Sequence, residues 1–289
     1  MGIAFKQGSA LYISDGATKY KFLVGEATAS QTFLDDRQEV KTLHDRSLVE
    51  RSFSTEKSPA SLTFSIHLAA GLPERELASW FDMPFISGTR HNIITSISLD
   101  AAPSQRDVFI ETGSTVYRLK DAVAENLSFT IGSKDLLSAN ITATAPDLED
   151  ISSNLTEFNS LSTVSQTSSG FRSDSVIIPG YSNIVGVTAE LTRAISWLSQ
   201  KSVFSIGSMY TVSTPMIDTL AVSGSITQIK LNNNKNYNPE ALIDIQYGPS
   251  FNLRLDKCSI TERWDLGNYH RVIADYTILP SAINSFLTF

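Results

Sequence analysis

Two stretches of this chain, one in each half, are built in the same way. Residues 117–146 and residues 253–280 each begin with an Arg-Leu pair and a charged pair, and continue as two alternating runs around a glycine-containing turn. The segment 139–142 (Ala-Asn-Ile-Thr) corresponds to 274–277 (Ala-Asp-Tyr-Thr). A repeat on this scale predicts two copies of one module, and the alternation predicts that each copy ends in a β-hairpin.

The charge of the chain restricts its partners. The formal net charge is −7, and no cluster of Lys and Arg forms a basic stripe. Tight binding to a phosphate backbone is therefore not expected. Charged residues make up 18% of the chain, and Ser and Thr are frequent. This composition favours β-strands with hydroxyl-rich faces.

The single cysteine excludes an intramolecular disulfide. Cys258 occupies the repeat position where Ala122 stands in the first half, so we expect a small buried side chain. No apolar run is long enough to span a bilayer, and the first residues lack the apolar core of a signal peptide. We therefore expect a protein made in the cytoplasm, without a membrane partner.

Residues 8–35 alternate around a turn at Asp15-Gly16 and predict a hairpin, and a charge-rich segment follows it. Residues 35–57 carry acidic and basic side chains in a weakly apolar background, and we interpret them as a long exposed loop or arm. Such an arm can form ion pairs with a neighbouring molecule; the alternative is a solvated loop. The candidate contact residues are Asp35, Asp36, Arg37, Glu39, Lys41, Asp45, Arg46, Glu50 and Arg51.

The clearest strand and helix come next. Residues 61–68 alternate strictly, with Leu62 and Phe64 on one face and His67 on the polar face. We therefore do not interpret His67 as a ligand. Residues 73–81 predict a short helix, because Pro73 suits the first turn and the apolar side chains share one face.

The repeat and the composition suggest domain boundaries. We expect a first module at residues 1–146, a Ser/Thr/Asn-rich linker at 147–178, and a second module at 179–289. The fold class is mainly β. In the second module, Asn-rich residues 232–236 stand where the first module has its helix, so the second copy is expected to lack it.

Motifs for catalysis are not found. The sequence has no nucleophile elbow, phosphate-binding loop, dinucleotide fingerprint or zinc motif, and its four histidines have no metal-like spacing. The adjacent acids Asp35-Asp36 and Glu149-Asp150 lie in polar segments that are usually solvated. Asp244 lies within a strand and points away from its isoleucine neighbours. We expect no enzyme activity, no cofactor and no metal.

The order of these elements resembles the module of the tail tube proteins of long-tailed bacteriophages. The resemblance rests on residues 59–68 followed by the helix at 73–81, and on the hairpin at 123–145 with its copy at 260–279. It implies two tandem β-sandwich or barrel modules with a short flanking helix. The missing second helix departs from that pattern.

The resemblance also implies partners and a location. Members of that group close into rings through sheet pairing between subunits, and the rings stack into a tube that conducts DNA. A duplicated module implies three subunits per ring with pseudo-sixfold symmetry. The expected partners are copies of the chain itself, other tail proteins, and the tape measure protein or DNA in the lumen without tight binding, all within the virion tail.

Other functions remain open. A tube-initiation or baseplate-hub protein would show the same features, and a β-sandwich adhesion or carbohydrate-binding module is a further alternative. Such a binding module usually exposes clustered aromatic residues, whereas Trp80, Trp197 and Trp264 fall in periodic segments and are expected in the core. A hydrolase would need a nucleophile and a base, for which no pair is found.

Overall fold

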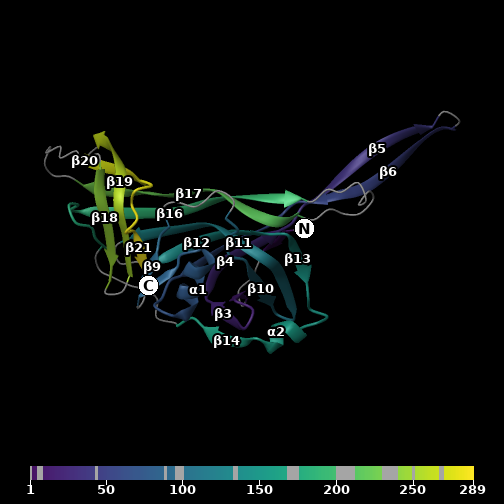
Figure 1. The fold of residues 1–289 in the computed structure, drawn as a ribbon, viewed down its shortest axis with the longest axis horizontal. Coiled ribbons are helices and arrows are strands. Elements are labelled where there is room, and N and C mark those ends of the chain that lie inside the picture. Colours follow the sequence, from purple (N-terminus) through teal and green to yellow (C-terminus); the bar gives the residue numbers. More distant parts are fainter. Residues whose placement is uncertain are drawn as a thin grey trace.

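The computed structural model of the chain confirms the mainly β prediction (Figure 1). It describes residues 2–4, 9–42, 45–87, 90–94, 101–132, 136–167, 176–199, 212–229, 240–248, 251–266 and 270–289. For residues 2–4, 33–56, 199, 212–213, 266 and 270 the description covers the backbone only. The turn predicted near 133–135 and the Asn-rich residues 232–236 lie outside the described residues. Residues 203–206, whose β-forming side chains predict a strand, also lie outside them.

One main sheet begins in the first half of the chain. Its strands pair antiparallel in the order β1, β4, β7, β12 and the C-terminal part of β11. The strict alternation of β7 places Leu62, Phe64 and Ile66 in the core. The bounds are β1 Gly2–Ala4, β4 Val24–Ser30, β7 Ala60–His67, β11 Thr115–Gly132 and β12 Ser138–Ala145.

A second sheet covers the apolar side of these strands. It contains β14, β3, β2, β10, the N-terminal part of β11 and β13. Ile13 and Val108 from this sheet pack with Phe64 and Ile141 from the main sheet in one core. The bounds are β2 Ala10–Ser14, β3 Thr18–Phe22, β10 Arg106–Thr112, β13 Asp147–Asp150 and β14 Ser162–Ser165.

The predicted helix is present as α1, Leu72–Trp80, with Pro73 in its first turn. Trp80 is fully buried, and its indole N–H donates to the carbonyl oxygen of Ala122 at 2.9 Å. A second short helix, α2, spans Thr156–Ser160 and was not predicted. Its Phe158 fills a small cluster against Tyr12 and Phe109, which explains why five residues hold a helical turn.

The second half continues the same main sheet. β16 pairs with the C-terminal part of β11, and β17, β20 and β19 follow in that order. The bounds are β16 Ile184–Ser199, β17 Val212–Ile229, β19 Phe251–Leu266 and β20 His270–Ile278. Both predicted closing hairpins are confirmed, as β11–β12 and β19–β20.

Shorter strands complete the second half. β18 pairs with β15 and β19, and the C-terminal strand β21 pairs with β19 and with β9 from the first half. β9 also pairs with β8. The bounds are β8 Phe85–Ser87, β9 Arg90–Asn92, β15 Val176–Ile177, β18 Glu240–Tyr247 and β21 Phe286–Thr288.

The charge-rich segment is not a loop. Residues 33–57 form a two-stranded antiparallel hairpin of β5, Phe33–Thr42, and β6, Asp45–Lys57. The hairpin makes a sheet of its own and extends away from the body of the molecule (Figure 1). The prediction of a long loop is therefore wrong, because β5 and β6 pair with each other. The expectation of a projecting arm is met.

Residues 147–178 carry more structure than a linker needs. β13 pairs with the start of β11, and β14 pairs in parallel with β3. The alternation of residues 107–119 predicts a single strand. That prediction is wrong, because the chain turns at Gly113, whose φ of 59° suits glycine, and forms β10 and β11.

Candidate functional site

The side of the main sheet opposite the core is lined by hydroxyl and amide groups. Residues that lie directly opposite each other in paired strands point to the same face. One such row runs from Ser65 across the sheet and ends at Ser259 on β19. Its members are Ser65, Asn140, Ser128, Glu190, Ser223, Thr277 and Ser259.

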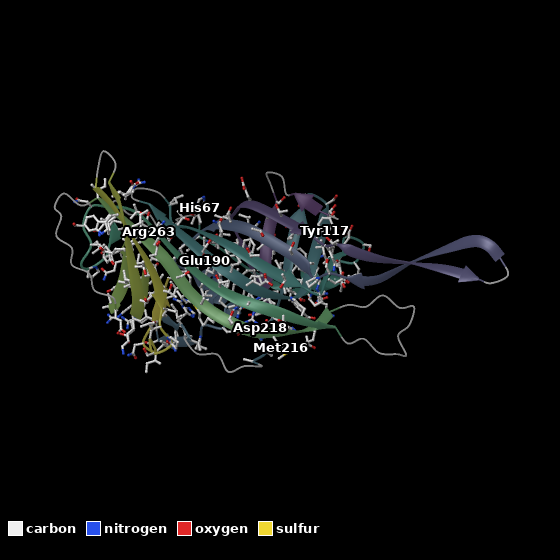
Figure 2. All side chains as sticks on the ribbon, turned by 90° about the horizontal axis from the view of Figure 1, so that it is seen from above. His67, Tyr117, Glu190, Met216, Asp218 and Arg263 are labelled. Atoms are coloured by element: carbon white, nitrogen blue, oxygen red, sulfur yellow. The ribbon has the colours of Figure 1, made fainter. Side chains whose placement is uncertain are left out.

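A second row lies beside the first. It links residues of both halves in one continuous line, and its members are His67, Ser138, Thr130, Thr188, Ser225, Asp275 and Thr261. We call the surface formed by these two rows the polar face. Figure 2 views the molecule from the side of the main sheet and labels His67, Glu190 and Arg263 along it.

Cross-strand hydrogen bonds order the polar side of the sheet. The hydroxyl groups of Thr188 and Ser225 lie 2.9 Å apart, and those of Ser30 and Ser61 are also 2.9 Å apart. The side-chain amide of Asn126, which adjoins the first row, donates to the Glu190 carboxylate. Such pairs hold neighbouring strands in register, and the two hydroxyl pairs do so without adding charge.

Charge on the polar face is sparse. Its rows contain the acids Glu190 and Asp275 and the exposed imidazole of His67, and the adjoining Arg263 donates from Nε to Asp275 at 3.1 Å. Because Arg263 is already paired, the face presents no run of cations that could neutralise successive phosphates. The face can form hydrogen bonds with water, but it lacks the cations that would hold a polyanion.

The two halves meet at the β11–β16 pairing, which we call the internal seam. Seven residue pairs form it, from Asn126 opposite Thr192 to Gly132 opposite Gly186. The strand register on either side of the seam is repeated. In the first half Ala27, Phe64 and Ile141 are cross-strand neighbours, and in the second half these positions are taken by Ala189, Gly224 and Tyr276.

The repeated register extends to irregular positions. The β10–β11 pairing shifts between Arg106 and Val108, and the β18–β19 pairing shifts between Ala241 and Ile243. In both hairpins the turn uses a glycine with positive φ, Gly113 at 59° and Gly248 at 65°. The buried Ala122 and Cys258 stand opposite Arg106 and Ala241 respectively.

Close packing requires glycine at position 224. A Cβ atom at Gly224 would lie 2.1 Å from the carbonyl oxygen of Thr188 and 2.3 Å from the hydroxyl oxygen of Tyr276. The Tyr276 side chain lies over Gly224, and its hydroxyl donates to the Thr188 carbonyl oxygen at 2.8 Å. The second half therefore has glycine at the position of Phe64, and the larger Tyr276 at the position of Ile141 on the neighbouring strand.

A buried arginine fastens the seam. Arg193 on β16 is 2% exposed and donates from Nε to the carbonyl oxygen of Ala124 at 2.9 Å and from Nη2 to that of Trp80 at 3.1 Å. It also forms an ion pair with Asp82. Burial lowers the pKa of Arg193, and the Asp82 carboxylate acts in the opposite direction. One side chain of the second half thus joins a helix end and a strand of the first.

The family model for the bacteriophage baseplate tube protein family matches residues 7–289. The chain belongs to that family. A comparison with curated proteins found no match. As a member of the baseplate tube family, the chain is a structural component of the phage tail or baseplate tube in the virion.

The family assignment agrees with the structural, non-enzymatic function expected for this baseplate tube protein. Among the described residues, no group of three His, Cys, Asp or Glu side chains could hold a metal ion. No described helix is both long and apolar enough to cross a membrane. Glu149 and Asp150 lie on β13, where the Asp150 carboxylate accepts from Ser152 and is exposed.

Several single-residue predictions can be compared with the tube protein's structure. His67 is exposed on the polar side, and Cys258 is buried, with its pKa raised to about 12 by desolvation. Trp80 lies in the core as expected. The prediction is wrong for Trp197 and Trp264, which are only half-buried; the Trp197 indole N–H donates to the Thr144 hydroxyl at 3.0 Å.

The candidate contact residues all lie on the arm. Asp35, Asp36, Arg37, Glu39 and Lys41 are on β5, and Asp45, Arg46, Glu50 and Arg51 are on β6. The register places Arg37 opposite Ser52 and Gln38 opposite Arg51. The structure brings these positions together on one hairpin, away from the polar face.

Proposed function

We propose that three copies of this chain form a ring of pseudo-sixfold symmetry that belongs to the baseplate part of the tail tube, with the polar face lining a channel for DNA. The observation that supports the proposal most is the continuous polar face, because its rows cross the internal seam without interruption. A channel wall must pass a polyanion, and sparse charge without a cationic run meets that need.

The repeated register supports the duplication. Each half presents the same strand order, β4–β7–β12–β11 in the first and β16–β17–β20–β19 in the second. The internal seam joins the last strand of the first set to the first strand of the second. Repeating this seam between chains would close a ring of six modules from three chains.

The arm supplies the contact between this ring and its neighbour along the tail. Its length, its separation from the body and its mixed charges suit complementary ion pairs with another ring or another tail protein. We expect a variant lacking residues 38–50 to keep its fold and its ring and to lose stacking. Stacked rings of unchanged stability would contradict this function of the arm.

Electron microscopy of the purified protein over a range of concentrations tests the ring. Rings of three chains with six similar lobes and a central channel are expected. A ring with another number of chains, or with one lobe per chain, would contradict the duplicated-module arrangement.

A charge insertion tests which surface lines the channel. The triple variant Ser128→Lys, Asn140→Lys and Ser223→Lys places cations along one row of the polar face. Rings of this variant should retain short duplex DNA at low salt and release it as salt rises. The control carries Thr156→Lys, Asn159→Lys and Ser160→Lys on exposed positions of α2, with the same change in net charge. Equal DNA binding by both variants would contradict the channel assignment.

A further inference from the structure

The first strand of the chain occupies an edge that the ring would need. The internal seam shows which edge this is: β16 pairs with β17 on one side and with β11 on the other. In the first half, β4 takes the place of β16, and β7 takes that of β17. The edge of β4 opposite β7 therefore corresponds to the edge of β16 that receives β11.

β1 lies on this edge, and in the matching register. It pairs antiparallel with β4 through three residue pairs, Gly2 with Ser30, Ile3 with Ala29 and Ala4 with Thr28. The repeated register matches Thr28, Ala29 and Ser30 to the β16 residues Glu190, Leu191 and Thr192, respectively. On β16 these residues pair with the β11 residues Ser128, Leu127 and Asn126. β1 thus pairs with the β4 positions that correspond to the first three β16 positions paired with β11 in the internal seam.

The strand that would follow in a ring is β19 of another copy. β19 matches β11 in its shift of partners, and Ile260 faces Tyr276 as Leu127 faces Ile141. Applying the register of the internal seam to the next chain places Ile260 opposite Ala29 and Thr261 opposite Thr28. The seam between chains would therefore use the same positions of β4 that β1 covers.

We propose that β1 is a removable cover of the β4 edge, and that β19 of a second copy displaces it when the ring closes. This inference rests on the proposed ring. An exposed strand edge invites uncontrolled pairing, and a short strand of the same chain protects it. β1 offers three pairs where the internal seam has seven, so an incoming strand can replace it with a longer ladder.

Two further observations fit a cover. β1 precedes residues 7–289, the part of the chain that the family model matches. Within the described residues, the strand register pairs β1 with β4 alone. As part of the same chain, β1 competes at a high effective concentration, so closure should begin only above a threshold protein concentration.

A reversible lock tests the displacement. In a Cys258→Ala background, Ala4→Cys and Thr28→Cys place two thiols on directly opposed residues, within reach of a disulfide. The oxidised variant should form at least tenfold fewer rings than the reduced form, and a reductant should restore them. Rings that form equally with the lock closed would overturn the inference.

A second pair of thiols reports the new seam. In the same background, Thr28→Cys with Thr261→Cys should give disulfides between chains, up to closed trimers, in oxidised rings. The matched control is Thr28→Cys with Thr277→Cys: Thr277 is also exposed on the polar side, but on β20, one strand further from the seam. Links in the control but not in the test pair would overturn the register.

The outcomes separate the inference from the function on which it rests. If the unmodified chain forms no ring of six modules, the proposed function fails. If that ring forms, the lock has no effect and Thr28 does not link to Thr261, only the assignment of β1 fails. Removal of residues 2–6 gives an independent measure, because loss of the cover should lower the concentration for ring formation by about tenfold or more.

Discussion

Replacement of Arg193 by leucine should destabilise the protein, because it removes a buried ion pair and two buried hydrogen bonds at the same time. The side chain is 1% exposed, and its guanidinium donates to the carbonyl oxygens of Ala124 and Trp80 and pairs with Asp82. Removing one partner of a buried ion pair costs about 3–5 kcal/mol in the free energy of unfolding. We expect the lower part of this range, because Asp82 is partly exposed and still accepts from the backbone N–H of Ser104.

Urea denaturation followed by fluorescence measures this cost. The matched control is Arg263→Leu, whose side chain is 66% exposed and whose ion pair with Asp275 spans 3.1 Å. An exposed ion pair contributes at most about 1 kcal/mol, so this variant should stay close to the parent. Asp82→Asn should also be costly, because it leaves the buried Arg193 guanidinium without its ion-pair partner. If Arg193→Leu and Arg263→Leu lower the free energy of unfolding equally, Arg193 does not fasten the seam.

Three further changes probe the core. Gly224→Ala should lower the free energy of unfolding by about 2–4 kcal/mol, because the new methyl group meets the Thr188 carbonyl and pushes Tyr276 from its hydrogen bond; an unchanged urea midpoint would refute the close packing. Burial raises the pKa of Glu74, so its contribution to stability is present below the unfolded value near 4.5 and is lost as pH rises. The stability of Glu74→Gln relative to the parent should therefore increase when the pH is raised from 4 to 7. Urea titrations at both pH values measure this change, and a difference in stability that does not depend on pH would contradict the prediction. The Cys258 thiol, with a pKa of about 12, should resist iodoacetamide at pH 8 in the folded protein and react after unfolding; rapid alkylation without unfolding would show that it is not buried.

Local patterns in the sequence predicted the local parts of the fold. The alternation at 61–68 gave a strand, and the proline and apolar spacing at 73–81 gave a helix, because both signals depend on neighbouring residues. The closing hairpins were predicted for the same reason. The strand pairing of the arm was missed, since its many charged residues have low strand propensity and the two strands stabilise each other.

Contacts between distant strands could not be predicted in this way. The pairing of β11 with β16 joins residues far apart in sequence, and no pattern within either strand specifies its partner. The polar face was only partly visible, through His67 and its alternating neighbours. Arg193 had a usable signal that was overlooked: it continues the buried positions Val187, Ala189 and Leu191, where a charged residue needs a buried partner.

The internal seam also bears on how such a chain can change over generations. A contact within one chain forms without a second molecule, so mutations that strengthen it carry no risk of premature association. A contact between separate chains has to remain weak until the chains assemble. A duplication of the module, as proposed, would therefore place two versions of one contact under different selection. The corresponding core positions already differ, with Phe64 and Ile141 in the first half and Gly224 and Tyr276 in the second.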